Sequence, residues 1–193
     1  MAKRSRPYHH GDLREALVGK AIAILDLSAD AELTLRGLAK EVGVSPMAPY
    51  AHFDDKDALL DAVAVSGFGA LRARMRETLD ALPAGTALDK ALSALAAAYM
   101  DFGLKRPGLY RVMFARPAAP QGTVVRDAGE DVFGELVQQF SGSAQNARRD
   151  AEMAWSMVHG MTLLVGTGFI KEGPDLKHHI DEIGHLLSGS RTR

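Results

Sequence analysis

The apolar residues of this chain recur at helical spacing along almost its whole length, and no segment alternates convincingly with a period of two. One amphipathic helix is predicted from about residue 10 to 27, and a long one from about residue 54 to 80. Later helical patterns, separated by glycine- and proline-containing stretches, cover residues 88–102, 109–114, 123–141, 146–170 and 175–188. With two short helices before the long one, the pattern predicts an all-α fold of about nine helices.

The two short helices lie between the first helix and the long one. Thr34 is a good N-cap for the first of them, and Gly43 stops it where a left-handed C-cap costs least. Ser45 is predicted to cap the second, so that Pro46 and Pro49 fall near its first turn, where proline is tolerated. Two short helices joined by a glycine-containing turn are the helix-turn-helix signature, whose second helix enters the major groove of DNA.

The second short helix carries side chains that suit this role. Met47, Ala48 and Ala51 are small or flexible, which lets the backbone approach the bases. Tyr50 and His52 offer groups that reach phosphate oxygens. Met47 cannot form a bidentate hydrogen-bond pair with a base, so contact with thymine methyl groups and readout of DNA shape are expected instead. The alternative, that Met47 is a core residue, stays open at this point.

Composition narrows the class of protein. The chain has 193 residues, of which 47% are hydrophobic and 24% charged, as in globular proteins with a substantial core. No apolar run reaches the ~18 residues that a membrane span needs, and the N-terminus lacks the apolar stretch of a signal peptide. The absence of cysteine excludes disulfides, thiolate metal sites and cysteine nucleophiles. We therefore expect a cytoplasmic protein with no membrane partner.

The formal net charge of −1 is unpromising for a nucleic-acid binder, but the charges are unevenly distributed. The first 20 residues hold five basic side chains against two acidic ones, Asp12 and Glu15. The basic ones are Lys3, Arg4, Arg6, Arg14 and Lys20. A basic arm along DNA phosphates and a solvated tail both explain this excess.

An enzyme is the main alternative class, and the sequence lacks its usual motifs. Nucleophile-elbow, zinc-protease and phosphate-loop patterns are all absent. The stretch GTGFIK has Lys171 where a dinucleotide loop needs its third glycine. His178 and His185 lie two helical turns apart and are predicted to be surface residues. No catalytic residue, metal site or cofactor is therefore predicted. A helical adaptor protein that does not bind DNA is the second alternative.

Two longer stretches resemble a known family. The segments YHHGDLREAL and LTLRGLAKEVGVSPMAPYAHFDDKDALLDAVA resemble the DNA-binding domain of the TetR family of transcriptional regulators. Helix cap, glycine turn, aromatic pair and the F-x-x-K-x-x-L pattern occur in the family's order. AAYMDFGLKRPGLYRVMF and AWSMVHGMTLL resemble the effector-binding half of the subgroup with a Trp-His-Gly signature. The resemblance implies a DNA-binding domain over residues 1–56 and a ligand-binding and dimerisation domain over residues 57–193.

The resemblance also assigns eight DNA contacts. They are Thr34, Ser45, Pro46, Met47, Ala48, Tyr50, His52 and Lys56. Lys56 and the N-terminus of the long helix would together hold a phosphate of the double-stranded operator. Two positions depart from the family. Ala51 stands where many relatives have a basic or polar residue, and Asp55 adds negative charge beside Lys56.

The effector pocket is predicted from aromatic and methionine side chains, which suit an adaptable apolar cavity. The candidates are Tyr99, Met100, Phe102, Met113, Phe114, Phe133, Trp155 and His159. Ordinary core packing is the alternative for each, and a buried, hydrogen-bonded histidine is the alternative for His159. Because this set holds few charges, an uncharged or weakly polar small molecule is expected as the effector.

The last two helices each carry one apolar face. The residues are Trp155, Val158, His159, Thr162, Leu163, Gly166 and Ile170 on the first, and Leu176, Ile180, Ile183 and Leu187 on the second. In the TetR family the corresponding pair forms a two-fold four-helix bundle, which implies a homodimer on a palindromic operator. An intrachain core explains the same faces. The predicted function is a ligand-responsive transcriptional regulator, expected to be a repressor, whose effector either releases DNA or promotes its binding.

Overall fold

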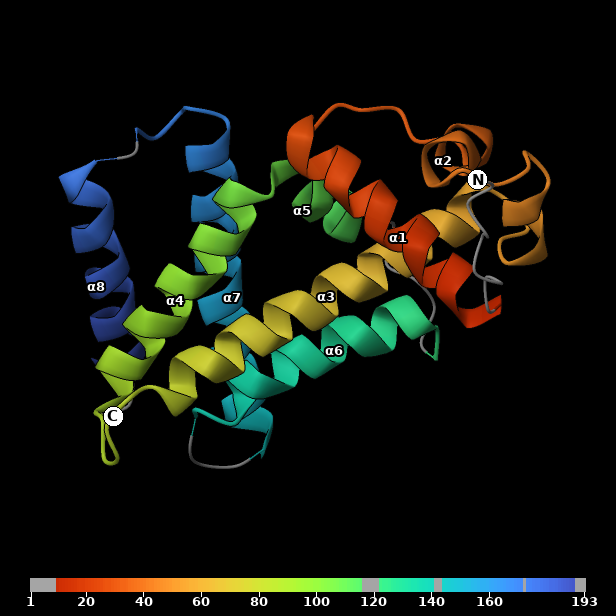
Figure 1. Ribbon diagram of the computed structural model, residues 1–193. Helices are drawn as coiled ribbons and strands as arrows, with labels where there is room; N and C mark the ends of the chain where they lie inside the picture. Colours follow the sequence, from red (N-terminus) through yellow and green to blue (C-terminus); the bar gives the residue numbers. More distant parts are fainter. Residues whose placement is uncertain (1–9, 116–121, 141–143, 172, 190–193) are drawn as a thin grey trace.

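The computed structural model describes residues 10–115, 122–140, 144–171 and 173–189. Within these ranges the chain forms eight α-helices and one 3₁₀ helix, without strands, which confirms the predicted all-α fold (Figure 1). The elements are α1 (His10–Leu27), α2 (Leu35–Val42), η1 (Ala48–Ala51), α3 (Lys56–Asp80), α4 (Leu88–Lys105), α5 (Pro107–Ala115), α6 (Val124–Val137), α7 (Ala144–Gly166) and α8 (Pro174–Gly189). The basic arm residues Lys3, Arg4 and Arg6 lie outside the described residues.

The ends of α2 are set by the two caps that the sequence predicts. Thr34 Oγ1 accepts a hydrogen bond of 3.0 Å from the Gly37 amide, which satisfies one of the free donors of the first turn. Gly43 ends the helix in the left-handed conformation, with φ of 79°. Leu35 and Leu38 are buried on the inner face of α2. The predicted boundaries of this helix are confirmed.

The second short helix differs from its prediction. It is one 3₁₀ turn, not an α-helix that begins at Ser45. Pro49 has no amide hydrogen, so the first hydrogen bond of an α-helix capped by Ser45, from residue 49 to the Ser45 carbonyl, cannot form here. The Ser45 carbonyl instead accepts from the amide of Ala48 at 3.0 Å, and Met47 occupies the N-cap without a side-chain bond. Pro49 is also fully buried.

α3 begins beside η1 and runs through the whole molecule (Figure 1). Asp55 caps it by accepting a hydrogen bond of 2.8 Å from the Ala58 amide. Its 25 residues make a rod about 37 Å long, because an α-helix rises about 1.5 Å per residue. α3 packs against α1, α4, α5 and α6. A single hydrophobic cluster runs along it, from Leu38 of α2 to Leu95 of α4.

α5 packs closely against the C-terminal end of α1 because it has a glycine at the point of contact. A Cβ atom on Gly108 would lie 2.6 Å from the carbonyl oxygen of Leu25 and 2.9 Å from Cα of Ala29. Both atoms belong to the backbone, so a side chain here would push the two helices apart.

Two arginines reinforce this contact between α5 and α1. Arg106 lies just before α5 and forms an ion pair of 2.7 Å with Asp26. Arg111 forms an ion pair of 2.7 Å with Asp30 and also donates to the carbonyl of Ala29. The end of α1 and the turn after it are therefore attached to the C-terminal half of the chain.

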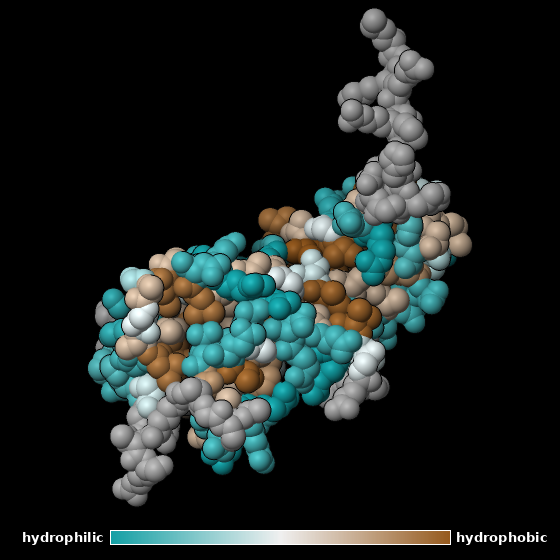
Figure 2. Space-filling model, turned by 90° about the horizontal axis from the view of Figure 1, so that it is seen from below, coloured by the Kyte–Doolittle hydropathy of each residue, from teal (hydrophilic) through white to brown (hydrophobic). Residues whose placement is uncertain are grey.

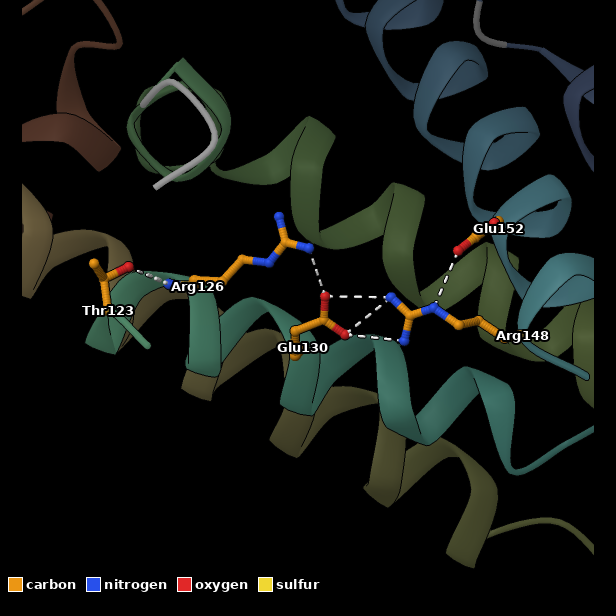
Figure 3. A network of polar contacts seen from close by, with 5 residues as sticks. All are labelled: Thr123, Arg126, Glu130, Arg148 and Glu152. Atoms are coloured by element: carbon orange, nitrogen blue, oxygen red, sulfur yellow. Dashed lines mark hydrogen bonds and ion pairs between the residues drawn. The ribbon is translucent and has the colours of Figure 1, made fainter. Parts of the chain in front are cut away.

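Ion pairs join α6 to its two neighbours. Arg72 of α3 lies 2.9 Å from Asp131 and 2.8 Å from the buried Glu135. On the other side, Figure 3 shows Arg148 of α7 reaching Glu130 of α6 at 3.2 Å. The two arginines that contact Glu130, Arg148 foremost, lower the pKa of that carboxyl group. α6 is therefore linked to both long helices by charge as well as by apolar packing.

The last two helices bury most of their predicted apolar faces within the chain itself. Val158 and Thr162 of α7 are buried, and so is Ile183 of α8. Leu176 and Ile180 are partly buried against the core, whereas the side chain of Leu187 lies outside the described residues. α8 packs mainly against α4. For most of the described residues of these faces, the intrachain alternative is therefore the correct one.

α7 ends four residues earlier than predicted, at Gly166. Gly168 takes a positive φ of 74°, and the amide of Ile170 donates back to the carbonyl of Leu164 at 3.0 Å. Large apolar side chains are also exposed along α7: Met153, Met157, Leu163 and Leu164. On the face of the molecule shown in Figure 2, apolar surface lies in patches divided by hydrophilic residues.

Replacement of Gly108 tests the packing of α5 on α1. Gly108→Ala should lower stability by about 1–3 kcal/mol, because its Cβ would overlap backbone atoms of α1. Thermal and urea denaturation measure the effect. Gly134→Ala in α6 is the matched control, since its Cβ meets no atom within 4 Å. This variant should be more stable than the wild type by about 0.5–1 kcal/mol in the free energy of unfolding. Equal effects in the two variants would contradict the close contact.

Candidate DNA-binding surface and effector pocket

The residues predicted to contact DNA gather on one surface formed by α2, η1 and the start of α3. Met47 is 65% exposed, which excludes the alternative that it is a core residue. Thr34, Ser45, Pro46, Tyr50 and Lys56 are also exposed, and Ala48 and His52 are partly buried. The arrangement presents Met47 and Tyr50 outward from a single turn beside the N-terminus of a long helix.

η1 is held from beneath by apolar packing. Pro49 and Phe53 are buried under it, and Phe53 joins the hydrophobic cluster that includes Leu38 of α2. The guanidinium carbon of Arg14, on α1, lies 5.3 Å from the centroid of the Phe53 ring, within cation–π range. A turn too short to be stable alone is therefore fixed by its neighbours.

The N-terminus of α3 combines a cation with partly used backbone donors. Lys56 is the first residue of the helix and is exposed. The Asp55 carboxylate accepts a hydrogen bond from the Ala58 amide and therefore acts as the N-cap. This cap explains the departure from the family pattern at Asp55. The Asp55 cap occupies one backbone donor of the first turn. Its negative charge also cancels part of the positive charge of the helix end that an approaching phosphate would meet.

Four aromatic side chains form a hydrogen-bonded group in the C-terminal half, here called the aromatic quartet: Tyr99 of α4, Tyr110 of α5, and Trp155 and His159 of α7. The indole N–H of Trp155 donates to the Tyr99 hydroxyl at 2.9 Å. Nδ1 of His159 lies 2.6 Å from the Tyr110 hydroxyl and 2.9 Å from the Tyr99 hydroxyl. The two hydroxyls are themselves 3.1 Å apart.

Burial determines the protonation of the quartet. It lowers the pKa of His159, which favours a neutral ring. It raises the pKa of Tyr110 to about 12 and also raises the pKa of Tyr99, so both phenols stay protonated. A neutral His159 then carries its proton on Nε2 and offers Nδ1 as acceptor to the phenols. This corresponds to the hydrogen-bonded alternative for the histidine.

The quartet separates two spaces. An inner cavity of about 40 Å³, lined mainly by apolar residues that include Tyr99, Phe133 and Trp155, has room only for water-sized molecules. A more open groove of about 440 Å³ lies between α5 and α7, and its walls include Tyr110 and His159. This volume is within the range of sites that bind small molecules. The groove is therefore the better candidate for an effector site.

The structure brings together five of the eight predicted pocket residues. Tyr99, Phe133 and Trp155 line the inner cavity, and Phe114 and His159 line the groove. The other three face the core and line neither space. They are Met100, Phe102 and Met113, with exposures of 2%, 8% and 2%. Their role in an effector pocket stays a prediction.

Comparison with known proteins identifies the fold. A family model described as "Bacterial regulatory proteins, tetR family" matches residues 31–63. A second, "Tetracyclin repressor-like, C-terminal domain", matches residues 92–183. A protein of unknown function from Rhodococcus sp. RHA1 is 32% identical, covers 96% of each chain, and superposes with a TM-score of 0.75. The chain belongs to the TetR family. It is a helix-turn-helix, DNA-binding transcriptional regulator.

Two further comparisons agree with this membership of the TetR family. The uncharacterized HTH-type transcriptional regulator Rv0681 of Mycobacterium tuberculosis is 28% identical over 184 residues, which are 93% of this chain and 82% of that protein. A tetR-family regulatory protein from Rhodococcus RHA1, 16% identical over 91% of this chain and 95% of its own, has the same fold with a TM-score of 0.62. Assignment to the Trp-His-Gly subgroup stays a prediction.

Two of the groove residues that sequence analysis missed are important for the chemistry of this TetR-family regulator. Tyr110 completes the quartet, and its position one helical turn before Phe114 was a signal that it shares a face with a predicted pocket residue. Arg111 also lines the groove. Nothing in its local sequence distinguishes it from a surface arginine.

The two C-terminal histidines lie on the surface in separate ion pairs. His178 lies 3.3 Å from Glu182, and His185 lies 3.2 Å from Asp89. Among the residues that the structure describes, no three histidine or acidic side chains gather as a metal site. Over the same part of the chain, no helix is both long and apolar enough to cross a bilayer.

The depressed pKa of His159 predicts how stability depends on pH. The unfolded state binds the proton more tightly, so the stabilisation is complete above the unfolded pKa of about 6.5 and is lost as the pH falls below it. The melting temperature should therefore fall between about pH 7.5 and about pH 5.5 more steeply in the wild type than in His159→Gln. The other histidines are the same in both proteins, so the difference isolates His159. Parallel curves would contradict its buried, neutral role.

Proposed function

We propose that this regulator is a repressor that binds a palindromic operator as a homodimer and responds to a small molecule. The observation that carries the proposal is the exposed η1 turn, with Met47 and Tyr50 outward, beside a helix that extends to the effector half. Membership of the TetR family supports it. Such a regulator acts in the cytoplasm, where its operator lies.

The proposed DNA contacts divide by role. Met47 and Ala48, with Ser45 and Pro46 before them, lie nearest the bases. Thr34, Tyr50, His52 and Lys56 contact the phosphate backbone. A single turn offers few side chains to the major groove, so most of the affinity would come from phosphate contacts, and the sequence preference largely from DNA shape.

The proposed dimer interface is an apolar stripe on α7. Met153, Met157 and Leu164 are 55%, 37% and 42% exposed, and their spacing places them on one face of the helix. This stripe lies apart from the face that packs into the chain's own core. On α8, Leu186 is 64% exposed. A two-fold bundle of α7 and α8 from two subunits would cover both surfaces.

The proposed coupling between the two halves runs through α3. It begins at Lys56 among the DNA contacts, and Met75 near its other end lines the inner cavity. Between them, Phe68 packs edge-on against Phe114 of the groove, with ring centroids 5.4 Å apart. An effector that moves Phe114 would tilt α3 and change the spacing of roughly 34–36 Å that two half-sites require. A coupling free energy of about 1–3 kcal/mol is sufficient. We keep the domain boundary after residue 56 as part of this proposal.

The DNA contacts can be tested by fluorescence anisotropy with an operator selected from random-sequence DNA. Lys56→Ala and Tyr50→Ala should weaken binding to all sequences, and Lys56→Ala should reduce the salt dependence by about one unit of slope per lost phosphate contact. Lys90→Ala, an exposed lysine of α4, is the control and should bind as the wild type does. Unchanged affinity in both test variants, or failure of the folded protein to select any operator, would contradict the proposal.

The dimer interface can be tested by sedimentation. The wild type should be a dimer, and Leu164→Glu should be monomeric, because a charge in an apolar two-fold interface is introduced twice. Val124→Glu is the control, since Val124 is 74% exposed at the start of α6, outside the stripe. A dimeric Leu164→Glu variant would place the interface elsewhere.

A further inference from the structure

We infer that the groove between α5 and α7 binds a small organic carboxylate with an apolar body, and that Arg111 binds its carboxylate by exchanging partners. The inference rests on the proposed response to a small molecule and names the chemical class of that molecule. It reverses the expectation of an uncharged effector, which was based on pocket candidates that did not include Arg111.

The composition of the groove favours an anion with an apolar body. Leu104, Phe114 and Leu163 provide apolar walls. Among the described residues that line the groove, Arg111 carries the formal charge and none is acidic. The neutral form of His159 adds no charge of its own. A ligand with one negative group therefore finds a complementary partner at Arg111 alone.

The hydroxyl groups of the groove do not compete with Arg111 as donors to a ligand. The hydroxyls of Thr162 and Thr167 donate to the carbonyls of their own helix, and the hydroxyl of Tyr110 faces His159 and Tyr99. These side chains have no free hydroxyl proton for a ligand. The guanidinium of Arg111 has several donors and matches the geometry of a carboxylate.

The present partners of Arg111 are exchangeable. Its ion pair with Asp30 joins side chains that are 52% and 92% exposed, so water and salt screen it and a ligand carboxylate can compete with Asp30. The neighbouring pair of Arg106 and Asp26 is only 28% and 33% exposed and has three hydrogen-bond contacts. The second pair can therefore keep α5 attached to α1 while Arg111 turns to a ligand.

The exchange would act on the DNA-binding surface directly. Asp30 and the carbonyl of Ala29 lie in the turn between α1 and α2, just before the Thr34 cap. When Arg111 leaves them, this turn loses its side-chain attachment to the C-terminal half. This loosens the placement of α2 and of η1 behind it, so the carboxylate should weaken operator binding.

The test uses matched acids and amides. Benzoate, 3-phenylpropanoate and octanoate are each compared with the corresponding carboxamide, which has nearly the same shape and no charge. Trp155 is the single tryptophan of the chain, and its ring lies 6.1 Å from that of Phe114, so its fluorescence reports binding in the groove. At least one acid should bind about tenfold more tightly than its amide, as expected for a charge-assisted contact.

Three variants assign the effect to Arg111. Arg111→Gln should lose the preference for the acid. Asp30→Asn should strengthen acid binding, because the competing carboxylate is removed, and a merely structural role of Arg111 would not produce this change. Arg74→Gln, at an exposed arginine of α3 outside the groove, is the control and should keep the preference. Far-ultraviolet circular dichroism confirms that each variant is folded.

The outcomes are distinguishable from those of the proposed function. The inference is overturned if no acid binds at millimolar concentration, if amides bind as tightly as acids, or if Arg111→Gln keeps the preference. Operator binding is measured separately without ligand. If the acid preference is absent and operator binding is intact, the carboxylate inference is overturned and the proposed regulator function stands. If the acid preference is present and operator binding is absent, the proposed regulator function is overturned and the carboxylate inference stands.

Discussion

The burial of α3 in a core shared by both halves of the chain is the interaction on which the rest of the structure depends. Leu59 and Val63 pack near the DNA-binding surface, and Leu71 and Met75 pack near the inner cavity, all in the same helix. Because one rigid helix of about 37 Å contributes to both regions, neither can shift independently of the other. The DNA-binding surface is therefore built on the same helix whose other end packs in the C-terminal half of the chain.

α5 provides a second connection of a different kind. Its approach to α1 requires the missing side chain of Gly108, and two arginines hold the contact at its edges. The same short helix presents Tyr110 and Phe114 to the groove. A nine-residue element thus contacts the recognition half with one side and the candidate effector site with the other. Small movements at the groove reach the turn before α2 without passing along α3.

The aromatic quartet gives this region an arrangement that a ligand can change at low cost. The two hydroxyls, the indole N–H and Nδ1 of His159 are hydrogen-bonded to one another, so burial of these atoms carries little penalty while the group is intact. A single acceptor, Nδ1 of His159, lies within reach of both phenols. A modest displacement of one ring therefore redistributes the hydrogen bonds and still leaves this acceptor with a donor. Such a group suits a population shift between two packed states.

The sequence by itself determined the ends of α2 and the family. Thr34 and Gly43 act within four residues of their own positions, so local chemistry was sufficient to predict them. The predicted α-helix from Ser45 is instead a 3₁₀ turn, because Pro49 has no amide hydrogen for an α-helical bond to Ser45. Tertiary structure alone decided that Arg111 lines the groove and that Met113 does not, because the direction a side chain faces depends on which helix packs beside its own. It likewise assigned the predicted apolar faces of α7 and α8 to the chain's own core and left another stripe exposed.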